Sequence, residues 1–148
     1  MSPAPGMRHQ HISGNLFVVL RKALAESSCN CTAFLPVDYK IAEDTVVQPD
    51  ILVVCNPQLS GKVLEQTPSL VAEVLSPSTA LKDRNSKYHL YEEAGVPYYL
   101  IIDHEKSVVE VYRLTDAAYQ LQAIDPKQPY TFQFSGCSAS IVLDDIWQ

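Results

Sequence analysis

The sequence predicts an α/β (α+β) fold in the order α-β-β-β-α-β-β, followed by a small β tail. Three observations support this order: apolar residues at helical spacing near the N-terminus, short apolar runs separated by turn residues, and a polar helical segment between a proline and a glycine. The chain has 148 residues, of which 47% are apolar and 19% charged, a balance typical of globular proteins. We therefore expect one domain that covers residues 1–148.

The first predicted helix covers residues 9–27, where six apolar residues recur every three or four positions. Two strands are expected next, at 32–41 and 46–55, joined by the polar turn AEDT. Pro49 interrupts the second of these strands, and because proline cannot donate a ladder hydrogen bond, pairing there should be partial or at an edge.

The third predicted strand, SLVAEVLS at 69–76, follows a turn-rich loop at 56–68 and is apolar on both faces except at Glu73. This pattern is typical of a central strand. An ionised carboxylate in an apolar core costs several kcal/mol unless something pairs with it. Glu73 therefore either faces water or has a cation as its partner.

The second predicted helix covers residues 79–94 and ends at Gly95, which suits a left-handed C-terminal position. Asp83, Lys87 and Tyr91 recur every four residues and so share one side of it. Either Asp83 and Lys87 form a surface ion pair, or this side faces the sheet and the Lys87 ammonium reaches toward Glu73. The remaining strands are expected at 97–103, 108–114, 118–124 and 130–134.

The composition limits the function classes. The net charge of −6 argues against a large non-specific nucleic-acid surface, although it leaves room for a local site. No apolar run approaches the roughly 20 residues of a membrane helix, and the N-terminal stretch MSPAPGMRHQH is not a signal peptide because no hydrophobic segment follows a basic start. We expect a cytoplasmic protein without a membrane partner.

Four cysteines lack the paired C-x-x-C spacing of a structural zinc site. They are Cys29, Cys31, Cys55 and Cys137. Their scatter predicts reduced thiols in a reducing compartment.

Strands 46–55 and 69–76 are expected to form an antiparallel hairpin around the intervening loop. Pairing that is symmetric about this loop places Asp50 opposite Glu73, with Cα atoms about 4.5–5.5 Å apart. Two carboxylates at this separation repel each other in an apolar setting, and Mg²⁺ relieves the conflict while leaving places for water and phosphate oxygens. Considered alone, Asp50 also fits a turn position after Pro49. Considered alone, Glu73 also fits a solvent-facing position on a half-exposed strand. Considered together, the two carboxylates favour a metal site.

The chain resembles the bacterial family of putative restriction endonucleases called Uma2 in three ordered stretches, QPDILVV, LVAEVLSPST and KDRNSKYHLYEEAGVPYYLIID. The likeness extends from MSPAPGMRHQHISGNL to DDIW near the C-terminus, although the chain starts late relative to the family pattern, which implies a missing or altered edge strand. The resemblance implies the PD-(D/E)xK fold, in which helices flank a mixed central sheet that carries a Mg²⁺-dependent phosphodiesterase site.

Matched to this pattern, Pro49-Asp50 is the PD element and Glu73 is the second acidic element. The signature expects a lysine at position 75, where this chain has Leu75. The family pattern has a lysine in the following helix instead, and the matching residue here is Lys87.

The resemblance therefore implies a metal-dependent DNA endonuclease, a hydrolase. Asp50, Glu73 and the backbone carbonyl of Val74 would hold Mg²⁺ or Mn²⁺, which lowers the pKa of a bound water. Lys87 would position that water or offset charge that develops on the phosphorus. Because cutting both strands takes two sites, a homodimer with DNA as its partner is expected.

Other polar residues near these positions have two interpretations. Lys82 and Arg84 either contact flanking phosphates or are solvated surface charges. His9 and His11 either reach the site or, as we favour, are ordinary helix-terminus residues. The tyrosines expected to pack in the core and not to stack on bases are Tyr88, Tyr91, Tyr98 and Tyr99.

Two other function classes stay open. A catalytically inactive nuclease-fold protein that binds nucleic acid or protein is favoured by the acidic charge, the late start and Leu75. In the other class, Asp50 and Glu73 are purely structural, and the protein neither binds metal nor cleaves DNA.

Overall fold

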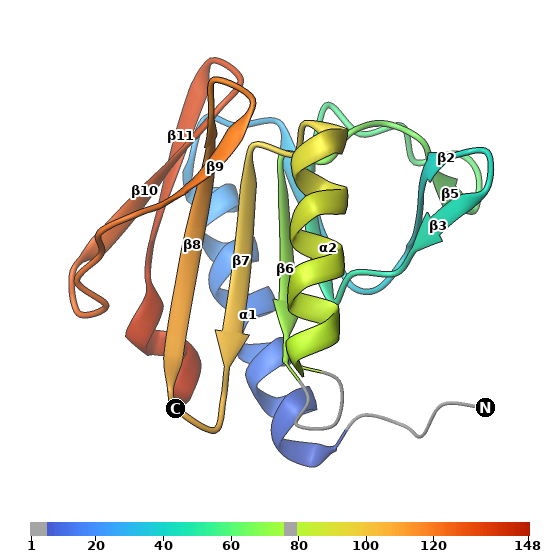
Figure 1. Ribbon diagram of the computed structural model, residues 1–148. Coiled ribbons are helices and arrows are strands. Elements are labelled where there is room, and N and C mark those ends of the chain that lie inside the picture. Colours follow the sequence, from blue (N-terminus) through green and yellow to red (C-terminus); the bar gives the residue numbers. More distant parts are fainter. Residues whose placement is uncertain (1–5, 76–79) are drawn as a thin grey trace.

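The computed structural model describes residues 6–75 and 80–148, including the side chains of all of these except residues 80–83 (Figure 1). These described stretches contain two α-helices and a short 3-10 helix: α1 (Met7–Glu26), α2 (Ala80–Ala94) and η1 (Leu143–Trp147). The strands are β1 (Cys31–Phe34), β2 (Asp38–Ala42), β3 (Thr45–Val47), β4 (Ile51–Cys55), β5 (Val63–Leu64), β6 (Leu70–Val74), β7 (Tyr98–Asp103), β8 (Val108–Thr115), β9 (Ala118–Leu121), β10 (Pro129–Phe134) and β11 (Cys137–Val142). Among these residues, no helix is long and apolar enough to cross a membrane.

The central sheet has six strands in the order β1-β4-β6-β7-β8-β9. It is mixed, because β6 and β7 are parallel while the other neighbouring pairs are antiparallel. Helix α2 follows β6 and crosses one face of the sheet, and α1 lies on the opposite face (Figure 1). The predicted fold class, a mixed sheet flanked by helices, is confirmed.

Helix α1 covers its face of the sheet because its apolar residues recur every four positions. Ile12, Leu16, Leu20 and Leu24 are all at most 5% exposed and pack on alternate residues of the strands. The hairpin of β10 and β11, together with η1, completes this core from the C-terminal end of the chain.

Residues from the first helix and the end of the chain are also joined by hydrogen bonds. The Asn15 amide donates to the backbone oxygens of Ile146 and Gln148, at 2.9 and 2.7 Å. Leu143 and Ile146 are buried in the same cluster as Leu16. The packing of α1 is therefore finished by residues more than a hundred positions later.

The N-terminal half contains more strands than predicted. The expected strand 32–41 is divided at Pro36 into β1 and β2, and the expected strand 46–55 is divided at Pro49 into β3 and β4. Strands β2, β3 and β5 form a separate small sheet, since proline breaks the ladder at both points. Strand β11 was also missed, because its alternating small and polar residues carry little strand signal.

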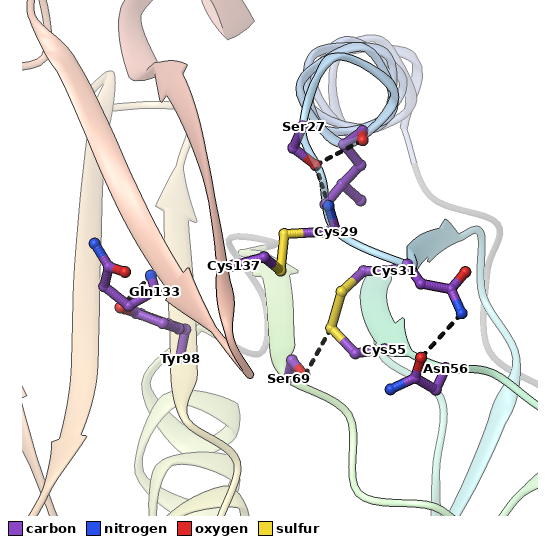
Figure 2. The surroundings of a disulfide bond; sticks show 11 residues. Ser27, Cys29, Cys31, Cys55, Asn56, Ser69, Tyr98, Gln133 and Cys137 are labelled. Atoms are coloured by element: carbon purple, nitrogen blue, oxygen red, sulfur yellow. Dashed lines mark hydrogen bonds between the residues drawn. A yellow bond between two sulfur atoms is a disulfide. The ribbon is translucent and has the colours of Figure 1, made fainter.

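The expectation of reduced thiols is wrong, because all four cysteines are paired in disulfides. Cys29 is bonded to Cys137 and Cys31 to Cys55 (Figure 2). Cys31 and Cys55 are direct partners in the register of β1 and β4, and the other bond joins the segment after α1 to the start of β11. The spacing of the cysteines in the sequence predicts neither pair, because the partners are brought together only by the sheet and the final hairpin.

Candidate active site

Strands β4 and β6 bring Asp50 and Glu73 together. The ladder pairs Ile51 with Ala72 and Leu52 with Val71, so the next position in the same register sets Asp50 opposite Glu73. The predicted register is thus the observed one. Asp50 directly precedes β4, where Pro49 has ended the previous strand.

Glu73 is buried in the sheet, with 7% of its surface exposed. All five residues of β6 are buried, and Glu73 alternates with Ala72 and Val74 so that its side chain lies on the face covered by α2. One of its carboxylate oxygens accepts a hydrogen bond from the Lys87 ammonium at 2.7 Å, and the other accepts one from the Tyr91 hydroxyl at 3.3 Å. A cation and a hydroxyl therefore compensate for its burial.

Helix α2 supplies both of these donors from one side. Lys87 and Tyr91 are four residues apart, one turn of helix, so the side predicted as a stripe does face the sheet. Tyr91 was expected only as core packing; it is fully buried against Tyr99, and it also bonds the Glu73 carboxylate. Its spacing from Lys87 was the signal that could have placed it in the site.

Asp50 is oriented by two different groups. Its Oδ2 accepts a hydrogen bond from the Val74 backbone N–H at 2.8 Å and lies 3.4 Å from Nε2 of His9. The interpretation of His9 as an ordinary helix-terminus residue is therefore wrong, because α1 crosses the sheet with its first turn close to the start of β4. Nδ1 of His9 is buried without a hydrogen-bond partner among the described residues. His11 points elsewhere, with Nε2 at 2.6 Å from the Gln148 backbone oxygen.

The electrostatics of the site are dominated by burial. Burial raises the pKa of the Glu73 carboxyl to about 7, although the Lys87 ammonium lowers it, and the neighbouring Asp50 carboxylate raises it further. Burial and the Glu73 charge also raise the pKa of Tyr91, so its hydroxyl remains a neutral donor. The Asp50 carboxylate thus adds to the cost of the Glu73 charge, and the Lys87 ammonium offsets part of that cost.

Leu75 occupies the position where the nuclease signature has its strand lysine. It packs in the cluster on the α2 face, the same face as Glu73 two residues earlier. A lysine at position 75 would point to this face, and in this chain Lys87 brings its ammonium to the same carboxylate from α2.

Among the described side chains of α2, Arg84 has different partners from Lys87. Arg84 forms an ion pair with Glu110 on β8 and donates to the Tyr112 hydroxyl at 3.4 Å. The side chains of Lys82 and Asp83 lie outside the described residues. Of the predicted site residues, the structure therefore brings together Asp50, Glu73, Val74 and Lys87, to which it adds His9 and Tyr91.

Comparison with known proteins identifies the family and the fold. The family model of Uma2, described as "Putative restriction endonuclease", matches residues 1–135. The chain belongs to the Uma2 family. A crystal structure described as a putative nuclease of the DUF820 group from Anabaena variabilis ATCC 29413 is similar to this Uma2 protein with a TM-score of 0.75. That likeness covers 99% of this chain and 84% of the other at 18% identity, which supports a shared fold. No curated protein matches the sequence.

The raised pKa of Glu73 predicts how the stability of the metal-free protein depends on pH. The unfolded chain loses the Glu73 proton near 4.5, while the folded pKa is about 7. Between these values the folded state binds more protons, so the free energy of unfolding falls as the pH rises, by about 3 kcal/mol in total. Denaturant unfolding should show this loss in the wild type and not in Glu73→Gln.

Glu26→Gln is the matched control, because Glu26 is an exposed carboxylate at the end of α1. It should keep the wild-type dependence. A Glu73→Gln variant whose stability varies with pH as the wild type does would contradict the assignment of the titration to Glu73.

Proposed function

We propose that this protein is a Mg²⁺- or Mn²⁺-dependent endonuclease that hydrolyses DNA phosphodiester bonds, and that it acts as a cytoplasmic homodimer. The observation that carries the proposal is the convergence of Asp50, Glu73 and Lys87 at the junction of β4, β6 and α2. Membership of a family described as restriction endonucleases supports the same reaction class.

The donor set fits a hard divalent cation. Asp50 and Glu73 supply carboxylate oxygens, and Val74 supplies a backbone carbonyl, while the remaining positions are left to water and a phosphate oxygen. Within the described residues, three ligand atoms of His, Cys, Asp or Glu lie within 4.8 Å of one another only at the cysteines. The proposed site therefore resembles the water-rich coordination of Mg²⁺ and not an all-protein cage.

A bound cation would polarise the phosphodiester and lower the pKa of an attacking water. The protein's own groups would prepare this geometry. The Val74 N–H orients one oxygen of Asp50, and the Tyr91 hydroxyl orients one oxygen of Glu73. The Lys87 ammonium, which pairs with Glu73 in the metal-free protein, would stabilise the charge that develops on the phosphate.

The alternative function is that of an inactive nuclease-fold module that binds nucleic acid or protein. One observation favours it: Lys87 and Tyr91 already satisfy the Glu73 carboxylate, so the burial of Glu73 does not by itself require a metal. The two experiments that follow separate the alternatives.

Lys87→Ala should reduce Mg²⁺-dependent nicking of supercoiled DNA by at least about 100-fold, because the ammonium stabilises charge in the transition state. Wild-type nicking should stop when EDTA is added. Lys22→Ala, which removes an exposed lysine of α1, should cut as the wild type does. A folded Lys87→Ala protein that nicks DNA at the wild-type rate would remove Lys87 from the mechanism.

Saturating Mg²⁺ or Mn²⁺ should raise the melting temperature of the disulfide-intact protein, since a ligand that binds only the folded state stabilises it. At an ion concentration about 100 times the Kd, the gain is about 2.7 kcal/mol, or roughly 5–10 °C. Glu73→Gln should lose most of this shift, and Glu26→Gln should keep it. Equal shifts in all three proteins, measured by differential scanning fluorimetry, would show that the ion binds elsewhere.

A further inference from the structure

The four cysteines form one cluster at the end of β4 remote from Asp50. The Sγ atoms of Cys29, Cys31 and Cys137 all lie within 4.8 Å of one another, and Cys55 is bonded to Cys31. Figure 2 shows the two disulfides side by side, between the end of α1, the β1–β4 pair and the start of β11. The cluster thus gathers three separate segments of the chain.

Three of the four sulfurs lie close to the spacing of a tetrahedral metal site. Zinc binds thiolates at about 2.3 Å, which places the sulfurs of a four-thiolate site roughly 3.8 Å apart. The sulfurs of Cys29, Cys31 and Cys137 already lie within 4.8 Å of one another, and the Cys55 sulfur is held beside this group by its bond to Cys31. Reduction frees each bonded pair to move apart to the spacing of a four-thiolate site. No carboxylate or imidazole belongs to the cluster, so its donors are soft and select Zn²⁺ over the hard cations proposed for Asp50 and Glu73.

The surroundings of the cluster provide access and support. A surface pocket of about 280 Å³ has Arg21, Ser27, Cys29 and Cys31 in its wall, so an ion or a reductant can reach the sulfurs from solvent. The Ser69 hydroxyl donates to the Cys55 sulfur at 3.4 Å, a contact of the kind that orients a metal ligand, and the Cys29 backbone N–H donates to the Ser27 hydroxyl.

We propose that Cys29, Cys31, Cys55 and Cys137, once reduced, form a four-thiolate Zn²⁺ site that replaces both disulfides. Two dithiol molecules reduce the two disulfides, giving four protein thiols and two oxidised dithiols. The thiols then release four protons as they bind one Zn²⁺. The segment after α1, the β1–β4 pair and β11 are thereby cross-linked under oxidising conditions by disulfides and under reducing conditions by the ion.

The test uses the full chain, reduced with a phosphine, desalted without oxygen and titrated with Co²⁺ and then Zn²⁺. One Co²⁺ per chain should give the visible bands of a tetrahedral thiolate complex, and Zn²⁺ should displace it. The disulfide-intact chain, treated in the same way, should show no bands. A reduced chain without these bands would overturn the proposal.

Two further measurements examine the ligands. Zn²⁺ should protect all four cysteines of the reduced chain from alkylation, counted by mass spectrometry, which needs no variant.

Cys55→Ser should weaken Zn²⁺ binding by more than about 100-fold, because losing even a partner that orients a ligand commonly costs about 10–100-fold. Ser138→Ala, next to Cys137 but not a ligand, should bind as the wild type does. Unchanged affinity in Cys55→Ser, or alkylation of any cysteine in the presence of saturating Zn²⁺, would refute the four-thiolate site.

Discussion

The contact between Glu73 and Lys87 fixes how the sheet and α2 fit together. A carboxylate in the middle of a fully buried strand needs a cation, and Lys87 provides it at 2.7 Å from the adjacent helix. This requirement determines which side of α2 faces the sheet, so Tyr91, one turn later, must also point inward. The same face then places the ammonium on the Glu73 carboxylate, which β4 and β6 set opposite Asp50. Fold and candidate chemistry therefore depend on one buried charge.

Much of this site could be predicted from the sequence, because its residues are linked by local geometry. Strands β4 and β6 pair antiparallel about the loop between them, so symmetric pairing gave the correct partner for Asp50. Helical spacing then placed Lys87 on the side of α2 that meets the sheet. Likewise, the signature residues Pro49 and Asp50 mark a real boundary, since the missing N–H of proline separates β3 from β4.

The features that could not be predicted arise from contacts between distant parts of the chain. His9 reaches Asp50 because α1 crosses the sheet, and helical periodicity says nothing about where the ends of a helix fall on the opposite strands. The cysteines were misjudged for the same reason. Their spacing does not match a zinc motif, yet strand register and the final hairpin gather all four sulfurs.

The packing of α1 has a consequence for how the protein is made. The helix is synthesised first, but its apolar side is covered partly by Phe132, Leu143 and Ile146, and Asn15 bonds to backbone near residue 146. A nascent chain that has emerged only as far as residue 125 therefore leaves part of this surface uncovered. Until translation has passed the final hairpin, the growing polypeptide presents an unfinished core to chaperones, and its native state is reached only after release of these late residues from the ribosome.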